Sequence, residues 1–194
     1  MYKRQKIQFT RATYYLSKPT LYDENETVIP VSENYFLVHH DTETLFIDPM
    51  TTSQTIDSIA VNIGVDASEN NNDPALQDND SPLAFQSPSM HWGWTNGYLF
   101  MVIEGTVDTD GNGILDDVFA FHIGLNSNLR EIRSASGLNI EANSTSKSYL
   151  TFEINYDQLF TGIDLSTDNS THTMDNPSLA ATFLANQPVA ITLK

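Results

Sequence analysis

Two segments of the chain place large apolar residues at alternate positions, and this pattern limits the fold more than any other feature. Residues 56–65 place a branched apolar residue, from Ile59 to Val65, at every second position, and residues 149–156 repeat the pattern. Because successive side chains on a strand point to opposite faces, a period of two predicts a strand with one buried face. Further strands are expected at 7–16, 34–40, 98–104, 117–124 and 189–193.

One helix is expected near the C-terminus, over residues 177–185. Asn176 can cap its first turn, Pro177 suits the first helical position, and Asn186 can end it. An irregular polar stretch over 66–89, rich in Asn and Asp, is expected to form a long functional or Ω-type loop. Together these elements predict an all-β fold, an antiparallel β-sandwich with a short C-terminal helix.

The length of 194 residues fits a single domain, expected over residues 6–194. Residues 1–5, Met-Tyr-Lys-Arg-Gln, resemble translated sequencing-adapter read-through and are set aside as non-native. On this interpretation the native N-terminus and any secretion signal lie upstream of the sequence. No run approaches the ~18 apolar residues of a transmembrane helix, so no membrane span is expected.

The composition excludes several classes of function. The formal net charge is −16 and the pI is about 4.3, so the chain repels phosphate backbones and a nucleic-acid partner is not expected. There is no cysteine, which leaves imidazole and oxygen as the strong metal ligands. The motifs Gly-x-Ser-x-Gly, His-Glu-x-x-His and the phosphate loop are missing from the sequence, so we do not expect an enzyme.

Both tryptophans of the chain, Trp92 and Trp94, lie in one short segment with His91. In an extended segment Trp92 and Trp94 share one face and His91 takes the other, and Asn96-Gly97 then favours a tight turn. This arrangement fits an aromatic core plug with an incidental histidine, or a ligand site beside an aromatic wall.

The run SMHWGWTNGYLFMVIEG at residues 89–105 resembles the signature of the MbnP-like family, and segments at 10–31, 59–76, 121–124 and 172–193 agree with it. The resemblance implies an exported, non-catalytic copper-binding protein, located in the periplasm, at the outer membrane or outside the cell. It also implies a tryptophan that a dihaem peroxidase-like partner oxidises to kynurenine.

Carried onto this sequence, the copper ligands of the family fall on His122, in the run FHIG, and on Asn71, where a histidine is expected. The oxidised tryptophan matches Trp92 or Trp94. His91 is a candidate for the missing imidazole, so the resemblance implies a copper site of His122, His91 and Trp92. Because amides are poor copper ligands, we expect weak copper binding in the bare protein unless His91 replaces the lost histidine.

A second candidate metal site is the run DTDGNGILDD at residues 108–117. Its oxygen donors fall at positions 1, 3, 5, 7 and 9 of a calcium loop. These donors are Asp108, Asp110, Asn112, the carbonyl of Ile114, and Asp116. Position 12, which needs a bidentate acid, is Phe119. A plain polar hairpin is the alternative, because Asp-Gly and Asn-Gly favour tight turns.

Two classes of function follow from these patterns. The first is an exported metal-binding protein with a copper site and a structural calcium loop. The second is a calcium-stabilised β-sandwich that acts as an interaction or surface-binding module and has no copper role. The sequence assigns no role to His172, which lies in another segment that agrees with the family.

Overall fold

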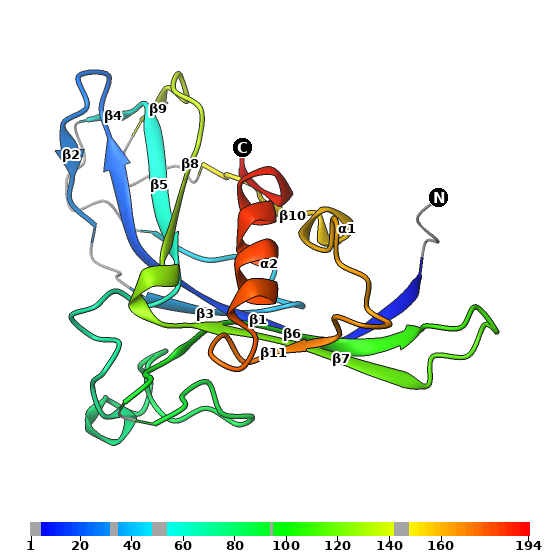
Figure 1. The fold of residues 1–194 in the computed structure, drawn as a ribbon. Helices are drawn as coiled ribbons and strands as arrows, with labels where there is room; N and C mark the ends of the chain where they lie inside the picture. Colours follow the sequence, from blue (N-terminus) through cyan, green and yellow to red (C-terminus); the bar gives the residue numbers. More distant parts are fainter. Residues whose placement is uncertain (1–4, 32–34, 48–53, 94, 142–147) are drawn as a thin grey trace.

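The computed structural model describes residues 5–31, 35–47, 54–93, 95–141 and 148–194. Most of its regular elements are strands, and both α-helices lie in the C-terminal part of the chain (Figure 1). The strands are β1 (Lys6–Tyr22), β2 (Val28–Ile29), β3 (Tyr35–His39), β4 (Thr55–Ile56), β5 (Ser58–Ile63), β6 (Leu99–Asp108), β7 (Asp117–Gly124), β8 (Arg130–Arg133), β9 (Ile140–Glu141), β10 (Phe152–Ile154), β11 (Ser170–Thr171) and β12 (Ile191–Leu193). The helices are η1 (Pro74–Leu76), η2 (Asn126–Asn128), α1 (Tyr156–Leu159) and α2 (Pro177–Ala190).

One eight-stranded sheet forms the centre of the molecule. Its strand order is β11-β7-β6-β1-β5-β8, and β2 and β3 also pair with β1. The 17 residues of β1 pair with β6 toward its start and with β3 and β5 farther along. These pairs are antiparallel, whereas β11 runs parallel to β7. The all-β, sandwich-like fold expected from the alternation is therefore confirmed, with one parallel pair as an exception.

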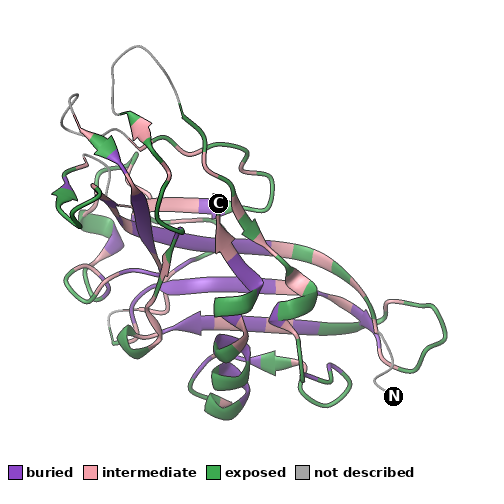
Figure 2. Ribbon diagram, turned by 90° about the horizontal axis from the view of Figure 1, so that it is seen from above, coloured by how far each residue is buried: buried purple, intermediate pink, exposed green. Residues whose placement is uncertain are grey.

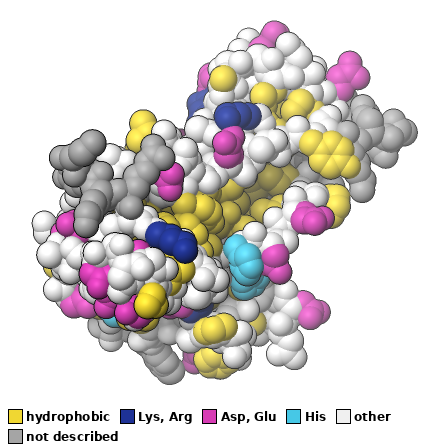
Figure 3. Space-filling view, turned by 90° about the vertical axis from the view of Figure 1, so that its right-hand side faces the viewer, with side chains coloured by type: hydrophobic (Ala, Val, Ile, Leu, Met, Phe, Trp, Pro, Cys, Tyr) yellow, Lys and Arg dark blue, Asp and Glu magenta, His cyan; other side chains and the backbone are white. Residues whose placement is uncertain are grey.

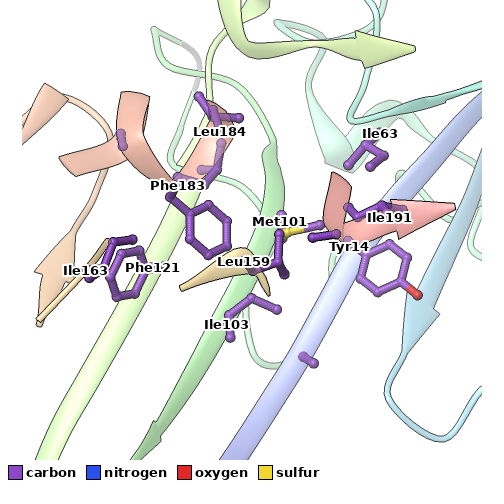
Figure 4. Close-up of a cluster of buried hydrophobic side chains, with 14 of the residues drawn as sticks. Tyr14, Ile63, Met101, Ile103, Phe121, Leu159, Ile163, Phe183, Leu184 and Ile191 are labelled. Atoms are coloured by element: carbon purple, nitrogen blue, oxygen red, sulfur yellow. The ribbon is translucent and has the colours of Figure 1, made fainter. Parts of the chain in front are cut away.

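Helices α1 and α2 and the two-stranded sheet β10-β12 cover one face of the central sheet (Figure 1). The largest apolar core lies between these layers and contains Met101 and Ile103 of β6 together with residues of both helices (Figure 4). Phe121 of β7 meets Phe183 of α2 with ring centroids 5.1 Å apart. We call this the helix-covered face.

The segment 66–98 covers the opposite face, and its described residues, 66–93 and 95–98, contain little regular structure (Figure 1). A second apolar cluster lies beneath it and includes Phe100 and Val102 of β6. The hydroxyl of Tyr15 of β1 donates to the carbonyl of Pro82 at 3.0 Å and so fixes the segment to the sheet. We call this the loop-covered face, and the long loop expected over 66–89 is confirmed.

The C-terminal helix is longer than its sequence predicts. Asn176 caps it as expected, but α2 continues to Ala190, so the predicted end at Asn186 is wrong. The predicted strand over 189–193 consequently begins only at Ile191. The side-chain amide of Asn186 donates to two backbone carbonyls, that of Leu159 at the end of α1 and that of Thr161 just after it.

The strand expected over 149–156 is also shorter, because β10 spans only Phe152–Ile154. The side chain of Asn155 accepts a hydrogen bond from the N–H of Gln158 at 3.2 Å and caps α1. An Asn cap satisfies one of the free N–H groups of a first helical turn. The alternation in the sequence therefore runs on into a helix that the prediction missed.

Buried residues gather in the central strands, while the tip between β6 and β7 and parts of α2 are exposed (Figure 2). Figure 3 shows the molecule from the side on which the N-terminus lies. Hydrophobic side chains line a hollow there, and histidine and acidic side chains lie at its edge. Within the described part of the chain, no helix has both the length and the apolar character needed to cross a membrane.

Candidate metal centre

His122 lies near the end of β7 on the loop-covered face, opposite Val102 of β6. Its Nε2 lies 2.7 Å from Oε1 of Glu104 on that neighbouring strand. Burial lowers the pKa of His122, although the Glu104 carboxylate opposes this change, so the ring is neutral near pH 7. A neutral ring that donates from Nε2 to a carboxylate keeps the lone pair of Nδ1 for another partner.

Arg11 of β1 links Glu104 to the loop. Its Nη1 lies 3.6 Å from Oε1 of Glu104, and its Nη2 donates to the carbonyl of Ser89 at 3.2 Å and lies 3.1 Å from Sδ of Met90. A polar row of Arg11, Glu104 and His122 thus crosses three adjacent strands of the sheet. This row is fastened to the segment that carries the tryptophans.

His172 directly follows β11, in which Thr171 lies opposite Phe121 of the parallel strand β7. Continuing this register places His172 beside His122, and the two imidazole rings have centroids 4.6 Å apart with planes at 88°. Nδ1 of His172 lies 2.9 Å from Oδ2 of Asp175, while Oδ1 of Asp175 accepts from the backbone N–H of His172 at 2.6 Å. Each ring of the pair therefore has one nitrogen against its own carboxylate.

Trp92 packs over Gly124, which follows His122 by two residues and so shares its side of β7. A Cβ atom at Gly124 would lie 2.7 Å from Cζ3 of Trp92 and 2.8 Å from the carbonyl oxygen of Tyr98. The structure thus brings two residues of the predicted copper site, Trp92 and His122, to one side of β7. The other tryptophan, Trp94, lies outside the described residues.

His91, the third residue of the predicted copper site, packs elsewhere. It forms an isolated β-bridge with Tyr98, and the two rings have centroids 4.7 Å apart. Its Nδ1 accepts from the N–H of Gly93 at 3.0 Å, and its Nε2 is buried with no hydrogen-bond partner among the described residues. The imidazole in contact with His122 is therefore that of His172.

Asn71, where the resemblance places the missing ligand, is exposed on the loop. Its neighbour Asn70 is only 2% exposed. Oδ1 of Asn70 accepts from the N–H of Tyr98 at 2.9 Å, and its amide donates to Asn126 at 2.9 Å. Asn70 therefore holds the loop to the segment before β6 and to η2.

The predicted calcium loop between β6 and β7 satisfies its first carboxylate with its own backbone. Asp108 accepts from the N–H groups of Gly111, Asn112 and Gly113 at 2.7, 3.1 and 2.8 Å. Asp110 also accepts from the N–H of Asn112, at 3.0 Å. Oδ1 of Asn112 accepts from the N–H of Ile114 at 2.7 Å, and the last two predicted donors, Ile114 and Asp116, belong to exposed residues. A tight polar hairpin of this form needs no cation to satisfy Asp108.

Among the described residues, no three His, Asp or Glu side chains form a group that could hold a metal ion. The candidate centre is therefore a pair of imidazoles, each with one nitrogen beside a carboxylate. Sequence reasoning named His122 and Trp92 but missed His172, Glu104 and Asp175. The His-x-x-Asp spacing of residues 172 and 175 is a local signal for one imidazole–carboxylate pair, but it says nothing of which strand lies beside it.

Comparison with known proteins agrees with this architecture. The MbnP family model matches residues 1–175 of the chain. The solved structure of MbnP from Methylosinus trichosporium is similar with a TM-score of 0.55 and 12% sequence identity, over 97% of this chain and 87% of that chain. At this identity the likeness concerns the fold alone. No curated protein sequence matches the chain.

Proposed function

The chain belongs to the MbnP family, and we propose that it is a non-catalytic protein that binds copper between His122 and His172. The proposal rests on the contact between two imidazoles that are each backed by a carboxylate, Glu104 for one and Asp175 for the other. Metal-binding histidines commonly donate their second N–H to a carboxylate, which fixes the tautomer and raises the basicity of the ligating nitrogen.

The chemistry of the pair favours copper. Imidazole suits copper, zinc, iron and nickel, and the affinity of nitrogen sites along the first row of divalent metals is highest for Cu(II). Structural zinc sites are almost always four-coordinate, whereas this pair supplies two nitrogens. In the proposal His172 supplies the imidazole that Asn71 lacks, from a different element of the fold.

Trp92 extends the proposal, because its ring lies over Gly124, close along β7 to His122. We propose Trp92 as the residue that a dihaem peroxidase-like partner oxidises, in an exported protein of the periplasm, the outer membrane or the cell exterior. Intact mass after exposure to such a partner tests this role. The mass is expected to rise by a small fixed increment in the wild type and to stay constant in Trp92→Phe.

Copper titration followed by tryptophan fluorescence and by competition with a chelator tests the metal site. His122→Gln and His172→Gln should each weaken copper binding by more than the roughly 10- to 100-fold that loss of an outer-shell partner costs. His91→Gln is the matched control, since that ring packs on Tyr98, and its affinity should equal that of the wild type. A copper affinity that is unchanged in the first two variants, or that falls in His91→Gln, would overturn the proposal.

A calcium-stabilised interaction module is the second candidate function. It is favoured by the gathering of Asp108, Asp110 and Asn112 in one turn. Calcium at a hundredfold excess over Kd would raise the free energy of unfolding by about 2.7 kcal/mol. Thermal melting with calcium or with a chelator measures this, with Asp110→Ala as the test and the exposed Asp168→Ala as the control. A melting temperature indifferent to chelator would remove this candidate.

A further inference from the structure

Thr173 lies between His172 and the start of α2, and its backbone adopts an unusual conformation. Its φ is +64°, and it is the β-branched member of the few non-glycine residues with positive φ in the described chain. The N–H of Met174 donates to the carbonyl of His172 at 2.7 Å, which closes a three-residue turn around Thr173. Turns of this form with positive φ at the centre are rare and strained. Strain of this kind persists only where the surrounding structure holds it in place.

The hydroxyl of Thr173 supplies that support. Thr173 is 5% exposed, and its Oγ1 donates to the carbonyl of His122 at 2.8 Å and accepts from the N–H of Gly124 at 3.1 Å. Both partners are backbone groups at the end of β7, beyond the last pair of β11 with β7, Thr171 with Phe121. One side chain therefore binds β7 where the ladder of the short strand has ended.

Asp175 cannot fix the position of His172 in this way. Its carboxylate bonds to the backbone N–H and to Nδ1 of His172, three residues earlier in the chain. These bonds orient the ring relative to its own turn. The bonds from Thr173 orient the turn relative to β7, on which His122 lies.

We propose that Thr173 is a positioning residue for the histidine pair. Its hydroxyl binds the end of β7, and its left-handed backbone turns the chain so that the ring of His172 stays against that of His122. Without the hydroxyl the turn loses this anchor, relaxes toward common backbone angles and takes His172 away from β7. The claim that this arrangement serves metal binding rests on the proposed function, whereas the hydrogen bonds between Thr173 and β7 do not.

The test compares Thr173→Val, which keeps the shape and removes the hydroxyl, with Thr173→Ser, which keeps the hydroxyl. In metal-free protein with labelled histidine, NMR should show the ring-to-ring contact of His122 and His172 in the wild type and in the Ser variant. Thr173→Val should lose at least half of that signal and weaken copper binding by about 10- to 100-fold, the scale of a lost outer-shell contact. Thr13→Val is the matched control, since Thr13 is also a buried threonine with a bonded hydroxyl, and both readouts should stay at wild-type values.

If Thr173→Val does not fold, Thr173→Ala makes the same comparison, because alanine lacks the hydroxyl and the β-branch but still disfavours positive φ. An undiminished ring contact, with a loss of stability like that of Thr13→Val, would overturn the proposal and leave Thr173 a purely structural residue. A wild-type protein that binds no copper would overturn the proposed function instead. The ring contact in the metal-free protein decides the role of Thr173 in either case.

Discussion

The two faces of the central sheet are built from alternate residues of the same strands, yet they differ in kind. On β7, Phe121 and Ile123 face the helices and are almost fully buried in the apolar core. On the other side of the same strand, His122 belongs to a polar row and Gly124 makes room for Trp92. β7 therefore contributes to the apolar core through one side and to the candidate metal centre through the other.

The covering layers account for the difference. The helices offer side chains such as Phe183 that interdigitate with the sheet and exclude water, so the helix-covered face accepts apolar residues. The loop-covered face has a smaller apolar cluster, and the loop is held partly by polar bonds such as that from Tyr15 of β1 to the carbonyl of Pro82. Beside that cluster, Arg11 and Glu104 keep 15% and 30% of their side-chain surface in contact with solvent. Partial solvation lowers the cost of placing charges there.

The largest effect is expected on the helix-covered face. Phe183→Ala removes a fully buried ring from between the sheet and α2 and should lower the free energy of unfolding by about 3–5 kcal/mol. Urea unfolding measures this loss, and the exposed Thr182→Ala on the same helix should change stability by less than about 0.5 kcal/mol. Copper affinity of the folded Phe183→Ala protein should be unchanged. A large change would show that the packing of the helix-covered face also controls the metal site.

The second prediction moves to the loop-covered face. Gly124→Ala brings a Cβ atom within 2.8 Å of both Trp92 and a backbone oxygen, so it should cost about 2–3 kcal/mol of stability and shift the tryptophan emission. The same substitution in a Trp92→Ala background should cost less, because one of the two clashes is gone. Equal costs in both backgrounds would show that the ring of Trp92 does not rest on Gly124.

Much of this comparison can be predicted from the sequence, because alternation is local. The apolar positions of residues 98–104 and 117–124 indicated two of the central strands, and both are present as β6 and β7. The helix start at Asn176 followed from its cap. These features depend on a few neighbouring residues, so a single sequence displays them.

The histidine pair could not be predicted in this way. β11 has two residues, too few to show a period, and it pairs with a strand about fifty positions earlier in the chain. The contact of His172 with His122 depends on that parallel register and on the turn at Thr173. His91 is a candidate in the sequence because it precedes Trp92, but its ring packs on Tyr98.

The third prediction concerns the carboxylate of Glu104 on the loop-covered face. Glu104→Gln keeps the shape of the side chain beside His122 but removes its charge, so copper binding should weaken by about tenfold, at the low end for an outer-shell partner. Competition with a chelator measures the change. Glu153→Gln, which disrupts an exposed pair with Lys194, is the matched control and should leave the affinity as it is. An unchanged affinity in Glu104→Gln would mean that the carboxylate does not tune His122.

The smallest effect is expected from acid, and it distinguishes the partly buried His91 from the exposed His40. Burial lowers the pKa of His91, although Asp73 opposes this, so the folded state binds a proton less readily than the unfolded chain, whose histidine pKa is about 6.5. Stability is therefore lost as the pH falls below about 6.5, until the folded ring is also protonated. His91→Gln should retain part of the stability that the wild type loses between about pH 7 and pH 5 in urea unfolding, and the exposed His40→Gln should lose as much as the wild type. If His91→Gln loses as much as the other two proteins, burial does not lower the pKa of His91 in solution, and its ring does not stay packed on Tyr98.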